Sequence, residues 1–103
     1  MGFKSKRSRA CDIAPKVKKI VADRDGGLCI ICKRPGSPNA HYIARSHGGL
    51  GIEQNIVTLC QDCHDCYDNG IFRESFKNAI RAYLKEKYED WDERKLIYRK
   101  GAI

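Results

Sequence analysis

The clearest hydrophobic pattern lies in the last third of the chain, where apolar positions recur at spacings of three and four. Residues at these spacings share one face of a helix. We therefore expect an amphipathic helix beginning near residue 72 and packing against the preceding segment, with the following tail folded back onto it. The helix face would consist of Phe72, Phe76, Ala79, Ile80, Tyr83 and Leu84, and the tail contacts of Trp91, Leu96 and Tyr98.

A second helix is predicted near the start of the chain. Asp12 can cap it, Pro15 falls in its first turn, and the glycines after Asp25 end it. Its apolar face would consist of Val17, Ile20 and Val21. Residues 1–10 lack apolar periodicity and are expected to form a basic flexible arm. The rest, 11–103, is expected to be a single domain with its motif core at 29–68 and a C-terminal helix and tail at 71–103.

Between these helices the pattern favours strands and turns. LCIICKRPG (28–36) predicts a short strand and a tight turn, and SPN a link into a strand at AHYIAR (40–45). HGGLGIEQN (47–55) predicts a glycine-rich hairpin loop, and IVTLC (56–60) the β-branched return strand. A short helix should begin near His64. The fold class is therefore α+β.

Two CxxC pairs carry the strongest chemical signal. Cys29 and Cys32 form one pair and Cys60 and Cys63 the other, and two such turns can complete a tetrahedral zinc site. Four protein ligands leave no open position, so this Zn²⁺ would be structural. A secreted disulfide scaffold, or haem attachment at CxxCH, would be the alternatives. Cys11 and Cys66 have no partner at this spacing and are expected to be small, buried or partly buried side chains.

The charge pattern points to a polyanionic partner. The chain has 20 Lys and Arg against 13 Asp and Glu, a formal net charge of +7. Lys16, Lys18 and Lys19 lie in the first predicted helix and are expected to contact the backbone phosphates of a nucleic acid. No apolar run approaches the roughly 20 residues that cross a bilayer, and no signal peptide is apparent. We therefore expect no membrane partner and a cytoplasmic location.

Four motifs in order resemble the HNH endonuclease family in its zinc-knuckle form, especially the small HNH proteins of phages and prophages. These motifs are the paired knuckles, His41 before a GG loop in AHYIARSHGG, Asn55 in EQNIVTLC and His64 in CQDCH. The match spans residues 29–68, and the resemblance implies that the cytoplasm is that of a bacterial or phage-infected cell. The resemblance implies a ββα-metal (His-Me finger) fold, in which a hairpin and a helix cradle one divalent ion against a phosphate of DNA.

The resemblance also implies site roles. His41 would be the general base that deprotonates water, and His64 a ligand of a catalytic divalent ion, Mg²⁺ or Mn²⁺, with Asp68 as a second candidate ligand. Asn55 would pin the hairpin loop, and Arg45 would contact DNA. Phosphodiester hydrolysis needs a base with a pKa near neutrality and a cation on the phosphate oxygens.

One departure from the family pattern opens alternatives. The residue before the base is commonly an aspartate or histidine that binds the ion, whereas here it is Ala40. Asp68, Asn39, or additional water and phosphate oxygens could substitute. The chain could instead be a zinc-stabilised DNA-binding module without turnover, or an accessory subunit of a phage DNA-packaging assembly. It could act as a monomer or as a homodimer.

Overall fold

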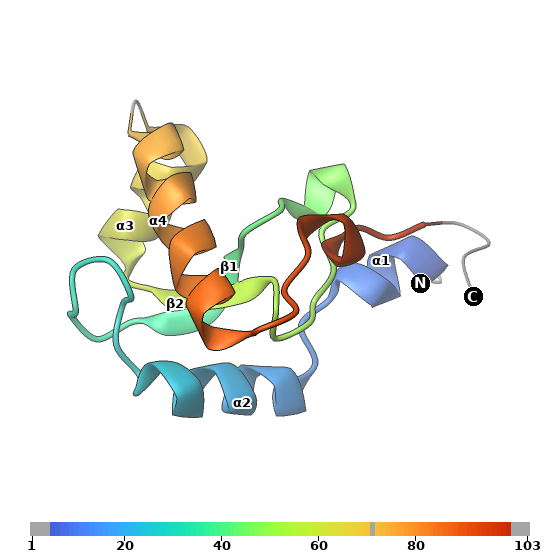
Figure 1. Cartoon of the computed structure of the whole chain (residues 1–103), viewed down its shortest axis with the longest axis horizontal. Coiled ribbons are helices and arrows are strands. Elements are labelled where there is room, and N and C mark those ends of the chain that lie inside the picture. Colours follow the sequence, from blue (N-terminus) through green and yellow to red (C-terminus); the bar gives the residue numbers. More distant parts are fainter. Residues whose placement is uncertain (1–4, 71, 100–103) are drawn as a thin grey trace, which may run out of the picture.

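The computed structural model describes residues 5–70 and 72–99 and combines a two-stranded sheet with helices on both of its faces (Figure 1). Helix α2 lies beneath the sheet, and α3 and α4 lie above it. The elements in order are α1 (Lys6–Cys11), α2 (Pro15–Asp25), β1 (Ser37–His41), the 3-10 helix η1 (Arg45–His47), β2 (Ile56–Leu59), α3 (Gln61–Asn69), α4 (Arg73–Lys87) and the 3-10 helix η2 (Glu93–Leu96). This arrangement confirms the predicted α+β class.

The sheet is an antiparallel pair in which Ala40 faces Val57 and His41 faces Ile56. All four residues of β2 are buried, because α2 covers one face of the sheet and the α3–α4 layer the other. Strand β1 begins at Ser37, so the expected link at 37–39 is part of the strand. It ends at His41 rather than at residue 45.

The predicted strand at 28–31 does not form. Leu28 makes only an isolated bridge to Pro35, and residues 29–34 close a turn in which the Cys29 N–H donates to the Arg34 carbonyl at 2.7 Å. Lys33 adopts a positive φ of 68° in this turn. The tight turn itself was predicted, and it curls the chain so that both sulfurs of the first CxxC pair face the same way.

The second half of the predicted N-terminal arm lies in helix α1. Ser5 accepts a hydrogen bond from the Ser8 N–H at 3.0 Å and caps α1, whose last residue, Cys11, is buried. Residues 1–4 of that arm lie outside the described residues. Asp12 ends α1 and does not cap α2, which begins at Pro15 without a side-chain cap. Helix α2 ends as predicted, at Gly26 in the left-handed conformation (φ 68°).

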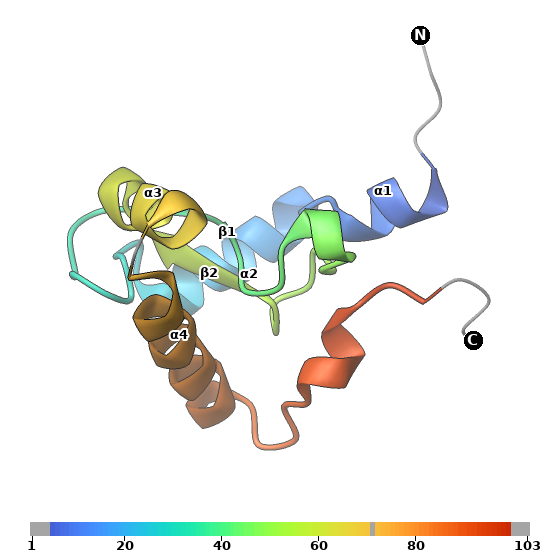
Figure 2. The same cartoon turned by 90° about the horizontal axis from the view of Figure 1, so that it is seen from above.

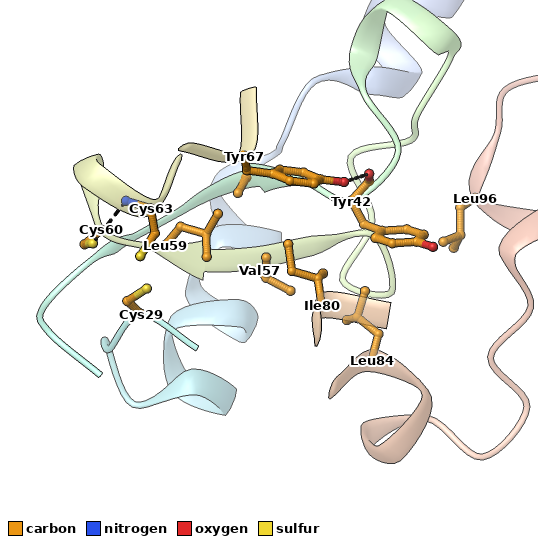
Figure 3. Packing of buried hydrophobic residues seen from close by; sticks show 11 residues of the cluster. Cys29, Tyr42, Val57, Leu59, Cys60, Cys63, Tyr67, Ile80, Leu84 and Leu96 are labelled. Atoms are coloured by element: carbon orange, nitrogen blue, oxygen red, sulfur yellow. Dashed lines mark hydrogen bonds between the residues drawn. The ribbon is translucent and has the colours of Figure 1, made fainter. Parts of the chain in front are cut away.

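The core forms where α4 packs on the sheet (Figure 3). Ile80 and Leu84 of α4 are fully buried, as the helix pattern predicted, whereas Ala79 is exposed. The tail folds back as expected, with Leu96 buried and the Trp91 Nε1–H donating to the Gln54 carbonyl at 2.8 Å. The remaining large members of this cluster are Cys29, Tyr42, Val57, Leu59, Cys60, Cys63 and Tyr67.

A buried ion pair fastens α2 to the rest of the protein. The Arg24 guanidinium donates to both carboxylate oxygens of Asp25 at 2.7 and 3.0 Å and to the carbonyls of Glu53 and Ile56 at 2.8 Å. Asp25 also accepts a hydrogen bond from Tyr83 of α4 at 2.5 Å. The pair therefore joins α2, the start of β2 and α4.

The described part of the chain contains no helix long and apolar enough to cross a membrane.

Candidate functional site

The four cysteines of the two CxxC pairs meet in one cluster. Their Sγ atoms all lie within 4.8 Å of one another. In each pair the second cysteine's N–H points at the first sulfur, at 3.5 Å for Cys32 to Cys29 and 3.4 Å for Cys63 to Cys60. Four converging thiolates fit a tetrahedral Zn²⁺ with no open position. The predicted ligand set is confirmed as an arrangement that could hold a metal ion. Figure 3 shows three of its members, Cys29, Cys60 and Cys63, near one another at one end of the core.

The remaining cysteines lie outside this cluster. Cys11 is buried and Cys66 is partly buried, as expected. All six cysteines lie within the described residues and all are free, which argues against the disulfide scaffold.

An arginine that the sequence pattern did not single out, Arg34, lies beside the cluster. The Arg34 side chain lies 3.4 Å from the Cys32 sulfur and 4.0 Å from the Cys60 sulfur, and pairs with Asp62 at 3.5 Å. Its hydrogen bond lowers the pKa of the Cys32 thiol to about 6. Arg34 therefore favours the thiolate form that binds a metal.

Next to the metal centre an open cleft of about 1020 Å³ contains both predicted histidines. His41 is the last residue of β1, and His64 lies in the first turn of α3, directly after the ligand Cys63. The cleft is lined by Asp12, Ile13, Lys18, Asn39, His41, Tyr42, Ala44, Arg45, Ser46, His47, His64, Tyr67, Asp68 and Arg73. The fold thus brings the two imidazoles to one concave surface.

His41 is held by a backbone oxygen. Its Nε2 lies 2.9 Å from the carbonyl oxygen of Cys11. Burial lowers the pKa of His41 below its usual value, and the neighbouring Arg45 and His64 act in the same direction, while the hydrogen bond to Cys11 opposes them. The ring is therefore neutral at pH 7, the state that a general base requires.

His64 and Asp68 face each other one turn apart on α3. The His64 Nε2 lies 3.5 Å from an Asp68 carboxylate oxygen, and both side chains are partly open to solvent. Imidazole and carboxylate are ligands for Mn²⁺, and carboxylate for Mg²⁺. Within the described residues, the cysteine cluster is the only compact group of three or more such ligands, so His64 and Asp68 are a pair without a third protein partner of this kind.

Asn55 is fully buried and ties the hairpin loop together. Its Oδ1 accepts from the Ile43 N–H at 2.8 Å, and its Nδ2 donates to the carbonyls of Ile43 and Leu50 at 3.2 and 2.8 Å. The Asn55 backbone carbonyl accepts from the Tyr42 N–H at 2.7 Å. These bonds take over from the strand ladder after His41, which explains why β1 ends there.

The position before His41 lies in the core. Ala40 is 1% exposed and belongs to the buried cluster. Its neighbours Asn39 and His41 line the cleft instead, as the alternation of side chains along a strand requires. The position where the resemblance expects a metal ligand is thus a core residue, and Asn39 and Asp68, the two side chains considered as substitutes, both line the cleft.

The basic residues divide into those that line the cleft and those that do not. Lys18 and Arg73 line it, and their side chains have no hydrogen-bond or ion-pair partner in the described part of the chain. Arg45 lines it too, but its guanidinium is paired with Asp12 at 2.6 Å. Lys16 and Lys19 are exposed on α2 away from the cleft lining. Arg73 was not foreseen, because its position relative to the cleft depends on how α4 packs.

Comparisons with known proteins agree with this geometry. The sequence profile of the family described as HNH endonuclease matches residues 29–70, which include the four cysteines of the cluster, His41, His64 and Asn55. The chain is also similar to the protein named Anaredoxin from Nostoc sp., with 37% identity over 57 residues, covering 53% of this chain and 75% of that protein. With its paired CxxC cluster and its hairpin-and-helix core in that matched region, this chain belongs to the HNH endonuclease family.

Proposed function

We propose that the protein is a metal-dependent endonuclease that hydrolyses phosphodiester bonds of DNA in this cleft. The observation that carries the proposal is the convergence of His41, with a lowered pKa, and the His64–Asp68 pair on one concave surface. Family membership supports the reaction class. The four-cysteine zinc site supports the scaffold and takes no part in the reaction.

The tautomer of His41 identifies the basic atom. A carbonyl oxygen can only accept a hydrogen bond, so the Nε2 that faces the Cys11 carbonyl must carry the hydrogen. In the neutral ring this leaves a lone pair on Nδ1. Nδ1 would therefore take the proton from the attacking water, and the Cys11 carbonyl would stabilise the imidazolium that forms.

His64 and Asp68 would hold the divalent cation, which when bound neutralises charge on the phosphate oxygens and the leaving oxygen. Because the protein offers few ligands there, phosphate oxygens and water would complete the coordination shell, with the Asn39 amide within the same cleft. Zinc binding by Cys60 and Cys63 would fix the first turn of α3 and hence the position of His64.

Lys18 and Arg73 would bind backbone phosphates on either side of the reacting one, because they are the cleft cations without a partner among the described residues. Contacts of this kind fix the register of the strand without reading bases. Arg45, held by Asp12, would contribute less than the sequence suggested. Lys16 and Lys19 would add only to the general attraction of α2 for a polyanion.

Plasmid nicking with added Mg²⁺ or Mn²⁺ tests the proposal at equal zinc content. His41→Ala should reduce the rate by about 10²- to 10⁴-fold, the usual contribution of a general base, and His64→Ala by at least about 10²-fold, because a metal supplies several kcal/mol. Asp68→Asn should reduce it, while Asp65→Asn, an exposed carboxylate of the same helix outside the cleft, should not. Equal cleavage by all variants would refute the assignment.

A second candidate is a DNA-binding module without turnover. It is favoured by one observation, the burial of position 40 in the core, which leaves the cation site with few protein ligands. This function predicts that the native chain binds DNA with Lys18 and Arg73 but cleaves none at any Mg²⁺ or Mn²⁺ concentration. Cleavage that His41→Ala abolishes would exclude it.

A further inference from the structure

Residues 8–12, the end of α1 and its cap, are attached to the loop that follows β1 (Figure 2). The Gly51 N–H donates to the Ala10 carbonyl at 3.0 Å, and Arg45 of η1 forms an ion pair with Asp12 at 2.6 Å. The Cys11 side chain is buried at 2% exposure. Three contacts of different kinds therefore fix this segment over a short stretch.

The approach of the two segments depends on a glycine. A Cβ placed on Gly51 would lie 2.0 Å from the Asp12 carbonyl oxygen and 3.0 Å from the Cys11 carbonyl oxygen. Real Cβ atoms do not approach oxygen so closely, so a side chain at position 51 would push residues 11 and 12 away. The displaced group would include the carbonyl that binds His41 at 2.9 Å.

We propose that residues 8–12 are a positioning element of the cleft, which docks on the 45–51 loop and holds the His41 imidazole in the tautomer with a free Nδ1. The N-terminal segment then belongs to the folded domain, in place of the arm that the sequence suggested. The importance of this tautomer for cleavage rests on the proposed function. The docking itself and its effect on the His41 ring do not depend on it.

The test begins with the native zinc-loaded protein. Nitrogen-15 spectra of the histidine rings at neutral pH should show His41 as the Nε2–H tautomer. Gly51→Ala should convert this signal to a mixture of tautomers and speed proteolysis within residues 5–12, with zinc content and helical signal retained. Its cleavage rate should fall by about 10²-fold, the effect expected of a small misplacement of a catalytic group.

Gly26→Ala is the matched control. It also adds one methyl group to a glycine, but its Cβ meets nothing within 4 Å, and its positive φ of 68° makes the substitution destabilising for reasons unrelated to the cleft. It should leave the His41 tautomer unchanged. Arg7→Gln, which removes the 3.0 Å hydrogen bond from α1 to the Ser46 carbonyl, should speed proteolysis of residues 5–12 without loss of zinc, and it serves if Gly51→Ala does not fold.

The outcomes separate the two proposals. An Nδ1–H tautomer in the native protein, or an Nε2–H tautomer unchanged in a folded Gly51→Ala variant, would overturn the positioning role. A tautomer that shifts in Gly51→Ala, in a protein that never cleaves DNA, would support the positioning role and refute the nuclease. If Gly51→Ala loses both the Nε2–H tautomer of His41 and the cleavage activity of the native protein, the positioning role and the nuclease are both supported.

Discussion

Replacing Asp25 with asparagine should destabilise the protein by about 3–5 kcal/mol, the cost of breaking a buried ion pair by removing one charge. The Asp25 side chain is fully buried and that of Arg24 is 11% exposed. The amide keeps the shape of the carboxylate, but its single oxygen can satisfy only one of the two guanidinium contacts at 2.7 and 3.0 Å. Its NH₂ group then faces another donor, and the Arg24 charge is left buried without a counter-ion.

Urea unfolding with saturating zinc, followed by Trp91 fluorescence and helical circular dichroism, measures this loss. Burial would raise the pKa of Asp25, but its hydrogen bonds with Arg24 and Tyr83 outweigh burial and lower it. A lowered folded-state pKa stabilises the protein above the unfolded value of about 3.9, and this stabilisation is lost as the pH falls through the folded value. The difference between native and Asp25→Asn should therefore be constant around neutrality and narrow only in acid.

Two further variants sharpen this test. Arg94→Gln breaks an exposed ion pair with Asp92 at 3.1 Å and should change stability little. The double substitution Arg24→Met with Asp25→Leu removes both charges and should be less destabilising than Asp25→Asn alone, because no unpaired charge remains. A loss below about 1 kcal/mol for Asp25→Asn, with an unchanged dependence of stability on urea, would refute the reasoning, since breaking a buried pair costs several times that.

Two other outcomes follow from the metal cluster and the cleft. Cys29→Ser should lose bound zinc and helical signal together, whereas Cys66→Ser should keep both, as measured by zinc content and circular dichroism. A Cys29→Ser protein that is folded but free of zinc would contradict the structural role of the metal. In the His41→Ala background, Lys18→Gln and Arg73→Gln should each make the fall of log affinity for DNA with log salt concentration shallower, by about 0.9 in the slope. Lys85→Gln removes an equal charge outside the cleft and should leave that slope unchanged.

The parts of the site that sequence could predict are those encoded by local spacing. Cys29 and Cys32, and likewise Cys60 and Cys63, are close because a tight turn or a helix start brings residues three apart together. His64 follows its zinc ligand directly, so its position was implied by the second pair. The α4 face was predicted for the same reason, since helical periodicity reports which side chains meet the core.

The parts that sequence could not predict depend on contacts between distant segments. Asp12 carries the residue type of a helix cap, yet its carboxylate pairs with Arg45, 33 positions away, and the helix it was expected to cap begins without it. The burial of Arg24 could not be predicted, because nothing in its local sequence shows that Glu53 and Ile56 offer carbonyls to it. The division into arm and domain and the choice between monomer and homodimer stay predictions.

His41 and His64 are positioned by different parts of the fold, so the metal cluster and the buried ion pair have separate roles at the cleft. The cysteine cluster fixes the start of α3 and therefore His64. His41 depends on the hairpin that Asn55 ties, and the Arg24 guanidinium bonds the carbonyls of Glu53 and Ile56 on either side of Asn55. Loss of zinc should therefore displace His64 first, whereas loss of the ion pair should loosen the loop that orients His41. Because His41 and His64 line the same cleft, either loss alone should change the position of one imidazole relative to the other.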